Sequence, residues 1–131
     1  MEMILEKFSL NGKSGIVTGG GSGIGKAIAT GVVQAGAEIV IVGRNKERLE
    51  KTAGEIRKFG GPVIPIQADV SRMGDIKSLV DRTIKEFGNI DFLFNNAGTI
   101  RRTPSEDFLE KEWDEVINTN LKGPFFLAQA V

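Results

Sequence analysis

The stretch TGGGSGIG, from Thr18 to Gly25, is the first place in the chain whose residue types and spacing could bind a ligand. It follows the short apolar run Gly15-Ile16-Val17 and precedes apolar residues at helical spacing. A strand, a glycine-rich turn and a helix N-terminus together make an anion site, because exposed N–H groups and the helix dipole attract negative charge. Glycine at this density weakens regular structure, so we expect a phosphate that needs bare backbone around it.

Three kinds of residue that often do chemistry are absent. The chain contains no His, no Tyr and no Cys. Without His and Tyr, about half of the usual general acids and bases are missing. Without Cys, disulfides and thiolate metal sites are excluded, and a reducing compartment is compatible with the composition.

Charge and hydropathy exclude two classes of partner. The chain has 17 Lys and Arg against 17 Asp and Glu, so no excess of either sign favours nucleic acid or a charged membrane surface. Glutamates interrupt the N-terminal segment where a signal peptide needs an apolar core, and no apolar run approaches the roughly 18 residues of a membrane span. The cytoplasm is therefore the expected location.

Alternating apolar runs and helical stretches predict the scaffold that positions the glycine turn. They predict an α/β fold of the Rossmann type over residues 1–131: a doubly wound parallel sheet in the order 3-2-1-4 with flanking helices. Pro62 and Pro65 in the third strand fit its place at a sheet edge, where a ladder donor can be missing. The expected strands are 15–18, 38–42, 62–68 and 90–94, and the expected helices are 23–35, a second to Phe59 capped by Asn45, a third to Phe87 capped by Ser71, and a last one from about Lys111.

A glycine turn inside such a strand–helix–strand unit predicts dinucleotide binding. The Thr-Gly-x-x-x-Gly-x-Gly spacing, Asp69-Val70, Asn95-Asn96-Ala97-Gly98 and Asn120-Leu121-Lys122-Gly123 occur in that order, and together they resemble the short-chain dehydrogenase/reductase family. The resemblance implies pyrophosphate and ribose contacts at the glycine turn, adenine contacts after the third strand, and ribose and nicotinamide contacts after the fourth. The implied cofactor-binding residues are Gly19, Gly21, Ser22, Gly23, Ile24 and Gly25, then Asp69 and Val70, then Asn96, Ala97 and Gly98.

The end of the second strand indicates which dinucleotide is preferred. An acidic residue about 20 positions past the turn would hold the ribose 2′-hydroxyl of NAD, whereas an Arg there would accommodate the 2′-phosphate of NADP. Here Arg44 and Asn45 follow the second strand, and the first acidic residue is Glu47. The pattern favours NADP, with NAD possible; alternatively, Arg44 is a solvated surface charge.

The resemblance supplies only one catalytic residue within this chain, Asn120. The family also uses a Ser and the Tyr and Lys of a Y-x-x-x-K helix, which are not matched here. Pro124 has no N–H, so the helix should kink and the Asn120 carbonyl should be free to hold a water. We therefore expect the chain to be the N-terminal, cofactor-binding half of an oxidoreductase that is homo-oligomeric, a dimer or tetramer, in its full-length form.

The segment NNAGTIRRTPSEDF bears on the substrate. It resembles sugar-acid dehydrogenases acting on gluconate or 2-deoxygluconate, and Arg101 and Arg102 could pair with a substrate carboxylate. An equally simple interpretation is that both arginines are solvated residues of a loop. Besides sugar acids, the expected substrate class includes alcohols and ketones. Two other functions stay open: a non-catalytic dinucleotide-binding module, and an inactive truncated remnant.

Overall fold

The apolar runs form one four-stranded parallel sheet. The computed structural model describes residues 1–131, and its strands lie in the order β3-β2-β1-β4. In the shared register, Gly15 of β1 lies opposite Ile39 of β2 and Phe92 of β4. The predicted strand order is confirmed. The strands are β1 (Ser14–Thr18), β2 (Glu38–Gly43), β3 (Val63–Gln67) and β4 (Phe92–Phe94).

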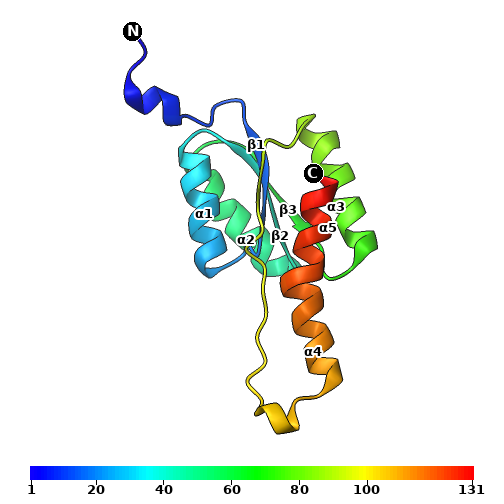
Figure 1. Ribbon diagram of the computed structural model, residues 1–131. Coiled ribbons are helices and arrows are strands. Elements are labelled where there is room, and N and C mark those ends of the chain that lie inside the picture. Colours follow the sequence, from blue (N-terminus) through cyan, green and yellow to red (C-terminus); the bar gives the residue numbers. More distant parts are fainter.

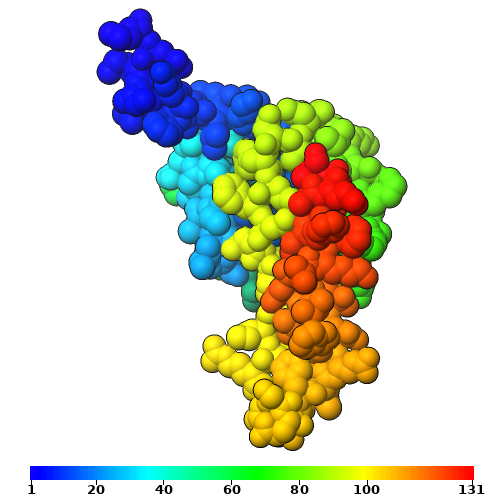
Figure 2. Space-filling model, viewed as in Figure 1, coloured from blue at the N-terminus to red at the C-terminus, as the bar shows by residue number.

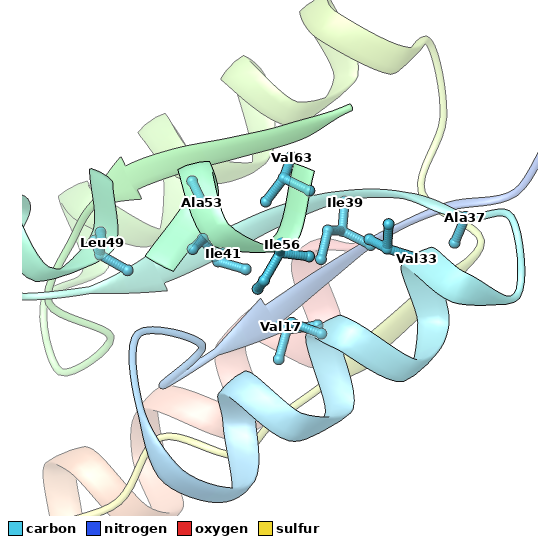
Figure 3. Packing of buried hydrophobic residues seen from close by; sticks show 10 residues of the cluster. Val17, Val33, Ala37, Ile39, Ile41, Leu49, Ala53, Ile56 and Val63 are labelled. Atoms are coloured by element: carbon cyan, nitrogen blue, oxygen red, sulfur yellow. The ribbon is translucent and has the colours of Figure 1, made fainter. Parts of the chain in front are cut away.

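Helices cover both faces of this sheet (Figure 1). One face carries α1 (Gly23–Gln34) and α2 (Lys46–Arg57), and the other carries α3 (Met73–Phe87) and α5 (Gly123–Ala130). Strands covered on both sides read as continuous apolar runs, as EIVIVG in β2 does. Figure 3 shows the core under α1 and α2, where Val17, Ile39, Ile41 and Ile56 are almost fully buried.

The last helical stretch is interrupted where the sequence predicts a kink. It consists of α4 (Glu110–Ile117), a π-helical turn η3 (Asn118–Lys122) and α5. The N–H of Gly123 bonds the carbonyl of Asn118, five residues back, and Pro124 follows directly with no N–H to donate. The predicted irregularity is thus present as a wider turn, while the water-binding role of the Asn120 carbonyl stays a prediction.

Several predicted boundaries move, and one predicted cap is wrong. Ser71 does not cap the third helix, because its hydroxyl and N–H both donate to Asp69 Oδ1, at 2.6 and 2.9 Å; Arg72 takes the cap position. The second helix ends at Arg57 instead of Phe59. The fourth strand is limited to Phe92–Phe94.

The β3 edge is protected, as its prolines predict. Pro65 lies in the strand and cannot donate a hydrogen bond to a neighbouring strand. Arg57 Nε and Nη2 donate to the carbonyl of Val63 at 3.0 and 2.6 Å, which occupies another edge group. These features oppose edge-to-edge pairing at β3.

Two segments project from the body of the molecule (Figure 2). One is the N-terminal turn η1 (Ile4–Phe8). The other is the N-terminal end of α4 together with the preceding short turn η2 (Ser105–Asp107). None of the helices combines the length and the apolar character needed to cross a bilayer.

Candidate functional site

A cleft of about 480 Å³ opens at the carboxyl ends of the strands. It is lined from the loops that follow β1, β2, β3 and β4, so segments far apart in sequence meet there. Ligands of doubly wound sheets bind at this end of the strands. The predicted residues among its lining are Gly19, Gly21, Ser22, Ile24, Arg44, Asn45, Asp69, Val70, Asn96, Ala97 and Gly98.

Two predicted glycines, Gly23 and Gly25, lie outside the lining, and only Gly25 packs behind it. Gly25 is buried, and a Cβ there would lie 2.0 Å from the carbonyl oxygen of Gly19. Gly19 itself has φ of +64°, and a Cβ on it would lie 2.8 Å from Asn96 Nδ2. Gly23 starts α1. Gly19 and Gly25 therefore allow close packing of turn, helix and fourth-strand loop, whereas Gly23 is exposed and has φ of +54°, a backbone conformation that favours glycine.

The N-terminus of α1 fits an anion. Ser22 occupies the cap position, but its side chain makes no capping hydrogen bond to the first turn. Ser22 and Ile24 line the cleft, so this end of the helix and its dipole face the open space. The donor set of bare backbone and a helix N-terminus suits a pyrophosphate.

Thr18 joins the glycine turn to the loop after β4. Its buried Oγ1 accepts the N–H groups of Asn96 and Ala97, at 3.0 and 2.9 Å, and donates to the carbonyl of Phe94 at 3.3 Å. Asn96 Nδ2 returns to the carbonyls of Thr18 and Gly19 at 3.2 and 3.4 Å. The two loops are thus held as one unit across the cleft.

Replacing Thr18 by Val should lower the free energy of unfolding by about 1–3 kcal/mol, the cost of leaving partly buried N–H donors unpaired. The shape is conserved, but the N–H of Ala97 loses its acceptor. Urea unfolding of Thr83→Val is the matched control, because Thr83 is equally buried and bonds only the Leu79 carbonyl of its own helix. That variant should change by less than about 1 kcal/mol. Equal losses in the two variants would contradict this role for Thr18.

Asp69 is fixed as a charged acceptor after β3. Its Oδ1 takes both Ser71 donors, and its backbone N–H donates to Asp75 Oδ2 at 2.8 Å. Burial raises the pKa of the Asp69 carboxyl, but the Ser71 hydrogen bonds and the charges of Arg44 and Arg72 outweigh burial and leave the pKa below its ordinary value. The carboxylate is therefore ionised at neutral pH.

Arg44 is exposed beside this carboxylate. Its carbonyl accepts Gln67 Nε2 at 2.9 Å, which fixes the backbone, while its guanidinium forms no ion pair. Asn45 caps α2, since its Oδ1 accepts the N–H of Arg48 at 2.9 Å. The cleft thus has a cationic end next to Asp69.

Asn120 lies outside the cleft lining, beside the loop that follows Gly98. Its Oδ1 accepts the N–H of Thr99 and its Nδ2 donates to the Thr99 carbonyl, both at 2.8 Å. Asn95 Nδ2 bonds the Pro124 carbonyl at 3.1 Å. The interrupted helix therefore holds the loop after β4, and Thr119 of the same π turn reaches the cleft.

The two arginines predicted for the substrate differ in their surroundings. Arg101 forms an ion pair with Glu115 and donates to the Ile100 carbonyl at 3.0 Å. Arg102 is exposed and makes no ion pair or side-chain hydrogen bond. Neither lines the cleft. Arg101 is thus engaged in holding the loop on α4, which leaves Arg102 as the available cation.

The structure also places residues at the cleft that the sequence analysis does not name. Arg48 has a sequence signal, because it is a second arginine in the same short segment, four residues after Arg44. The others come from strand ends, where apolar residues resemble core, from the first turns of α2 and from η3. They are Val42, Gly43, Leu49, Ala68 and Thr119. No group of three acidic, His or Cys side chains is placed to hold a metal ion.

Comparison with known proteins gives one consistent result. The profile of the family described as short chain dehydrogenase matches residues 13–131. The chain is 44% identical over 128 residues to 2-dehydro-3-deoxy-D-gluconate 5-dehydrogenase of Escherichia coli (strain K12), covering 98% of this chain and 50% of that protein. The chain thus spans about half the length of that curated relative.

Solved structures agree. A short-chain type dehydrogenase/reductase from Mycobacterium marinum superposes with a TM-score of 0.94 at 33% identity, over 98% of this chain and 52% of that one. The crystal structure of NAD+-bound xylitol dehydrogenase gives a TM-score of 0.88 at 35% identity, over 93% and 47% of the two chains. The sheet and its flanking helices therefore match about half of each structure.

Proposed function

Because the chain belongs to the short-chain dehydrogenase family, we propose that it is the cofactor-binding half of an NAD(P)-dependent oxidoreductase. The observation that carries the proposal is the single cleft that brings the glycine turn, Arg44, Asp69 and the Asn96 loop together. A cofactor of two nucleotides needs an anion site flanked by two different base and ribose sites, and the different strand-end loops that line the cleft support this assignment.

Each part of the cleft has its own task. Bare backbone from Gly19 to Gly25 and the N-terminus of α1 bind the pyrophosphate. Asp69 and Val70 hold the adenine end, and Arg44 with Asn45 favours NADP over NAD through its guanidinium. Asn96, Ala97 and Gly98 line the ribose and nicotinamide side. The hydrogen bonds from the Asn96 and Ala97 N–H groups to Thr18 Oγ1 hold the nicotinamide side at a fixed position relative to the pyrophosphate site.

The nicotinamide supplies hydride chemistry when it is bound, and this chain's residues orient it. Asn120 holds the Thr99 backbone on both sides, which sets the loop where substrate approaches. We propose that the proton-transferring Ser, Tyr and Lys belong to the other half of the enzyme, because this chain has no Tyr and therefore no Y-x-x-x-K motif. The oxidoreductase half described here binds and positions, and transfers no proton itself.

For the substrate we propose a hydroxyl or carbonyl compound, an alcohol or ketone, and among these a sugar acid. The name of the Escherichia coli relative, a dehydrogenase of 2-dehydro-3-deoxy-D-gluconate, supports this class. Arg102 is the free guanidinium available to a carboxylate, while Arg101 keeps its loop in place through Glu115. We further propose that the full-length enzyme is cytoplasmic. We also propose that it is a homo-oligomer, because Trp113, Leu121 and Phe125 leave an apolar side of α4 to α5 exposed.

A fluorescence titration with NADPH tests the proposal. The 131-residue chain should bind NADPH saturably, yet oxidise or reduce sugar acids with NAD(P) at no measurable steady rate, because losing general acid–base catalysis alone costs about 10²–10⁴-fold. A dinucleotide-binding module without catalysis would bind NADPH in the same way. Turnover by the full-length protein would distinguish the oxidoreductase from such a module. Failure to bind NADPH at millimolar concentration would refute both functions.

A further inference from the structure

Arg48 is the one cleft-lining cation that the proposed function leaves without a task. Its aliphatic stem packs against the glycine turn: a Cβ added to Gly21 would lie 3.7 Å from both Cγ and Cδ of Arg48. Its backbone N–H is held by Asn45 Oδ1 at 2.9 Å. The base of the side chain is therefore fixed beside the turn, and Arg48 is one of the residues that line the cleft.

Helix α2, which carries Arg48, is fastened to the same turn. Thr52 lies one helical turn further on, and its hydroxyl donates to the carbonyl of Gly21 at 2.8 Å. Leu49 is buried and also packs near Gly21, 3.4 Å from the same built Cβ position. The distance between the glycine turn and the start of α2 is thus set by the fold. A ligand lying across both would meet Arg48 in a fixed place.

The charges around Arg48 leave it unbalanced. Lys26 pairs with Glu55 and Lys46 with Glu50, whereas the guanidinium of Arg48 forms no ion pair or side-chain hydrogen bond. Arg44 has the nearby Asp69 carboxylate to offset its charge, but Arg48 does not. Arg44 and Arg48 both line the cleft, so two positive charges there favour a ligand with negative charge over a neutral hydroxyl.

We propose that Arg48 is a specificity-determining residue whose guanidinium, together with that of Arg44, binds the phosphate on the adenosine ribose of NADP. The inference rests on the proposed function and deepens it. A phosphate of charge near −2 can accept hydrogen bonds from both guanidiniums at once. A ribose that carries only hydroxyls leaves both charges unmatched, so Arg48 discriminates through its charge and Arg44 is not the sole determinant.

Adenosine 2′,5′-bisphosphate and 5′-AMP test Arg48 without any need for turnover. They differ only in the 2′-phosphate, and their affinities for the 131-residue chain can be measured by calorimetry. R48Q should weaken binding of the bisphosphate by about 10-fold or more and change 5′-AMP by less than about 2-fold. R48M keeps an unbranched apolar stem over Gly21, so it should give the same loss if charge is responsible.

K51Q is the matched control, since Lys51 is an exposed cation on α2 that does not line the cleft. It should leave both affinities within about 2-fold of wild type. The inference is overturned if R48M retains the wild-type ratio of the two affinities, or if both Arg48 variants lose the two nucleotides equally. A wild-type chain that binds neither nucleotide would instead refute the proposed function, and Arg48's role with it.

Discussion

Replacing Arg44 by Asp is expected to reverse the cofactor preference of the chain, from NADPH to NADH. The change removes a guanidinium–phosphate contact worth about 1.5–3 kcal/mol, which corresponds to roughly 10- to 150-fold in affinity. The introduced carboxylate repels the 2′-phosphate and can accept hydrogen bonds from the ribose hydroxyls of NADH. Dissociation constants for NADPH and NADH, measured by their fluorescence at one ionic strength, give the ratio directly.

Arg72→Gln is the control for a general loss of positive charge near Asp69. Arg72 Nε lies 3.9 Å from Asp69 Oδ2, but Arg72 does not line the cleft. Loss of the Arg72 guanidinium should weaken the binding of NADPH and of NADH to a similar, small extent. If Arg44→Asp leaves the ratio of the two affinities unchanged, Arg44 is a solvated surface charge and the NADP assignment is wrong.

Gly25→Ala should weaken NADPH binding and destabilise the fold. The new Cβ would lie 2.0 Å from the Gly19 carbonyl oxygen and 2.5 Å from Asn96 Nδ2, so the turn and the fourth-strand loop have to separate. Overpacking of this kind costs about 1–3 kcal/mol in stability. Binding should fall by about 10-fold or more, because displacing the turn removes hydrogen bonds to a charged phosphate, each worth about 1.5–3 kcal/mol. NADPH titration and urea unfolding measure the two effects.

Gly31→Ala is the control, because it adds a methyl group to α1 at a position without close neighbours. Gly31 is exposed in the same helix, and a Cβ there meets nothing within 4 Å. Alanine is about 0.5–1 kcal/mol better than glycine in a helix interior, so this variant should be more stable and bind NADPH as wild type does. Normal binding by Gly25→Ala would show that the turn tolerates a side chain at Gly25 and that its spacing has another cause.

The sheet and most of the cleft could be predicted because they depend on local patterns. Apolar runs such as EIVIVG give the strands, and Pro62 and Pro65 place the third one at the edge. The carboxyl ends of parallel strands then bring the glycine turn, Asp69 and Asn96 together without further information. The strand order follows from the doubly wound fold class, and the two prolines support it.

The predictions that failed, and the features that were not predicted, depend on competition between hydrogen-bonding and ion-pair partners in the folded chain. Ser71 is a good capping residue, but Asp69 two positions earlier takes both of its donors. Pro124 predicts an irregular helix, although the choice of a π turn is made by contacts that the sequence does not reveal. Arg101 looks free in sequence, yet Glu115, 14 positions away, neutralises it. Such pairs form only in the folded chain.

Nuclear magnetic resonance of the ¹⁵N-labelled chain during titration with NADPH tests the central claim most directly, because it reports binding and place together. We predict saturable shifts at the amides of Gly21, Val70 and Gly98, one from each of three strand-end loops, with the amides of η1 unchanged. Saturable shifts confined to residues outside the cleft, or no shifts at millimolar NADPH, would contradict the claim that this cleft binds the dinucleotide.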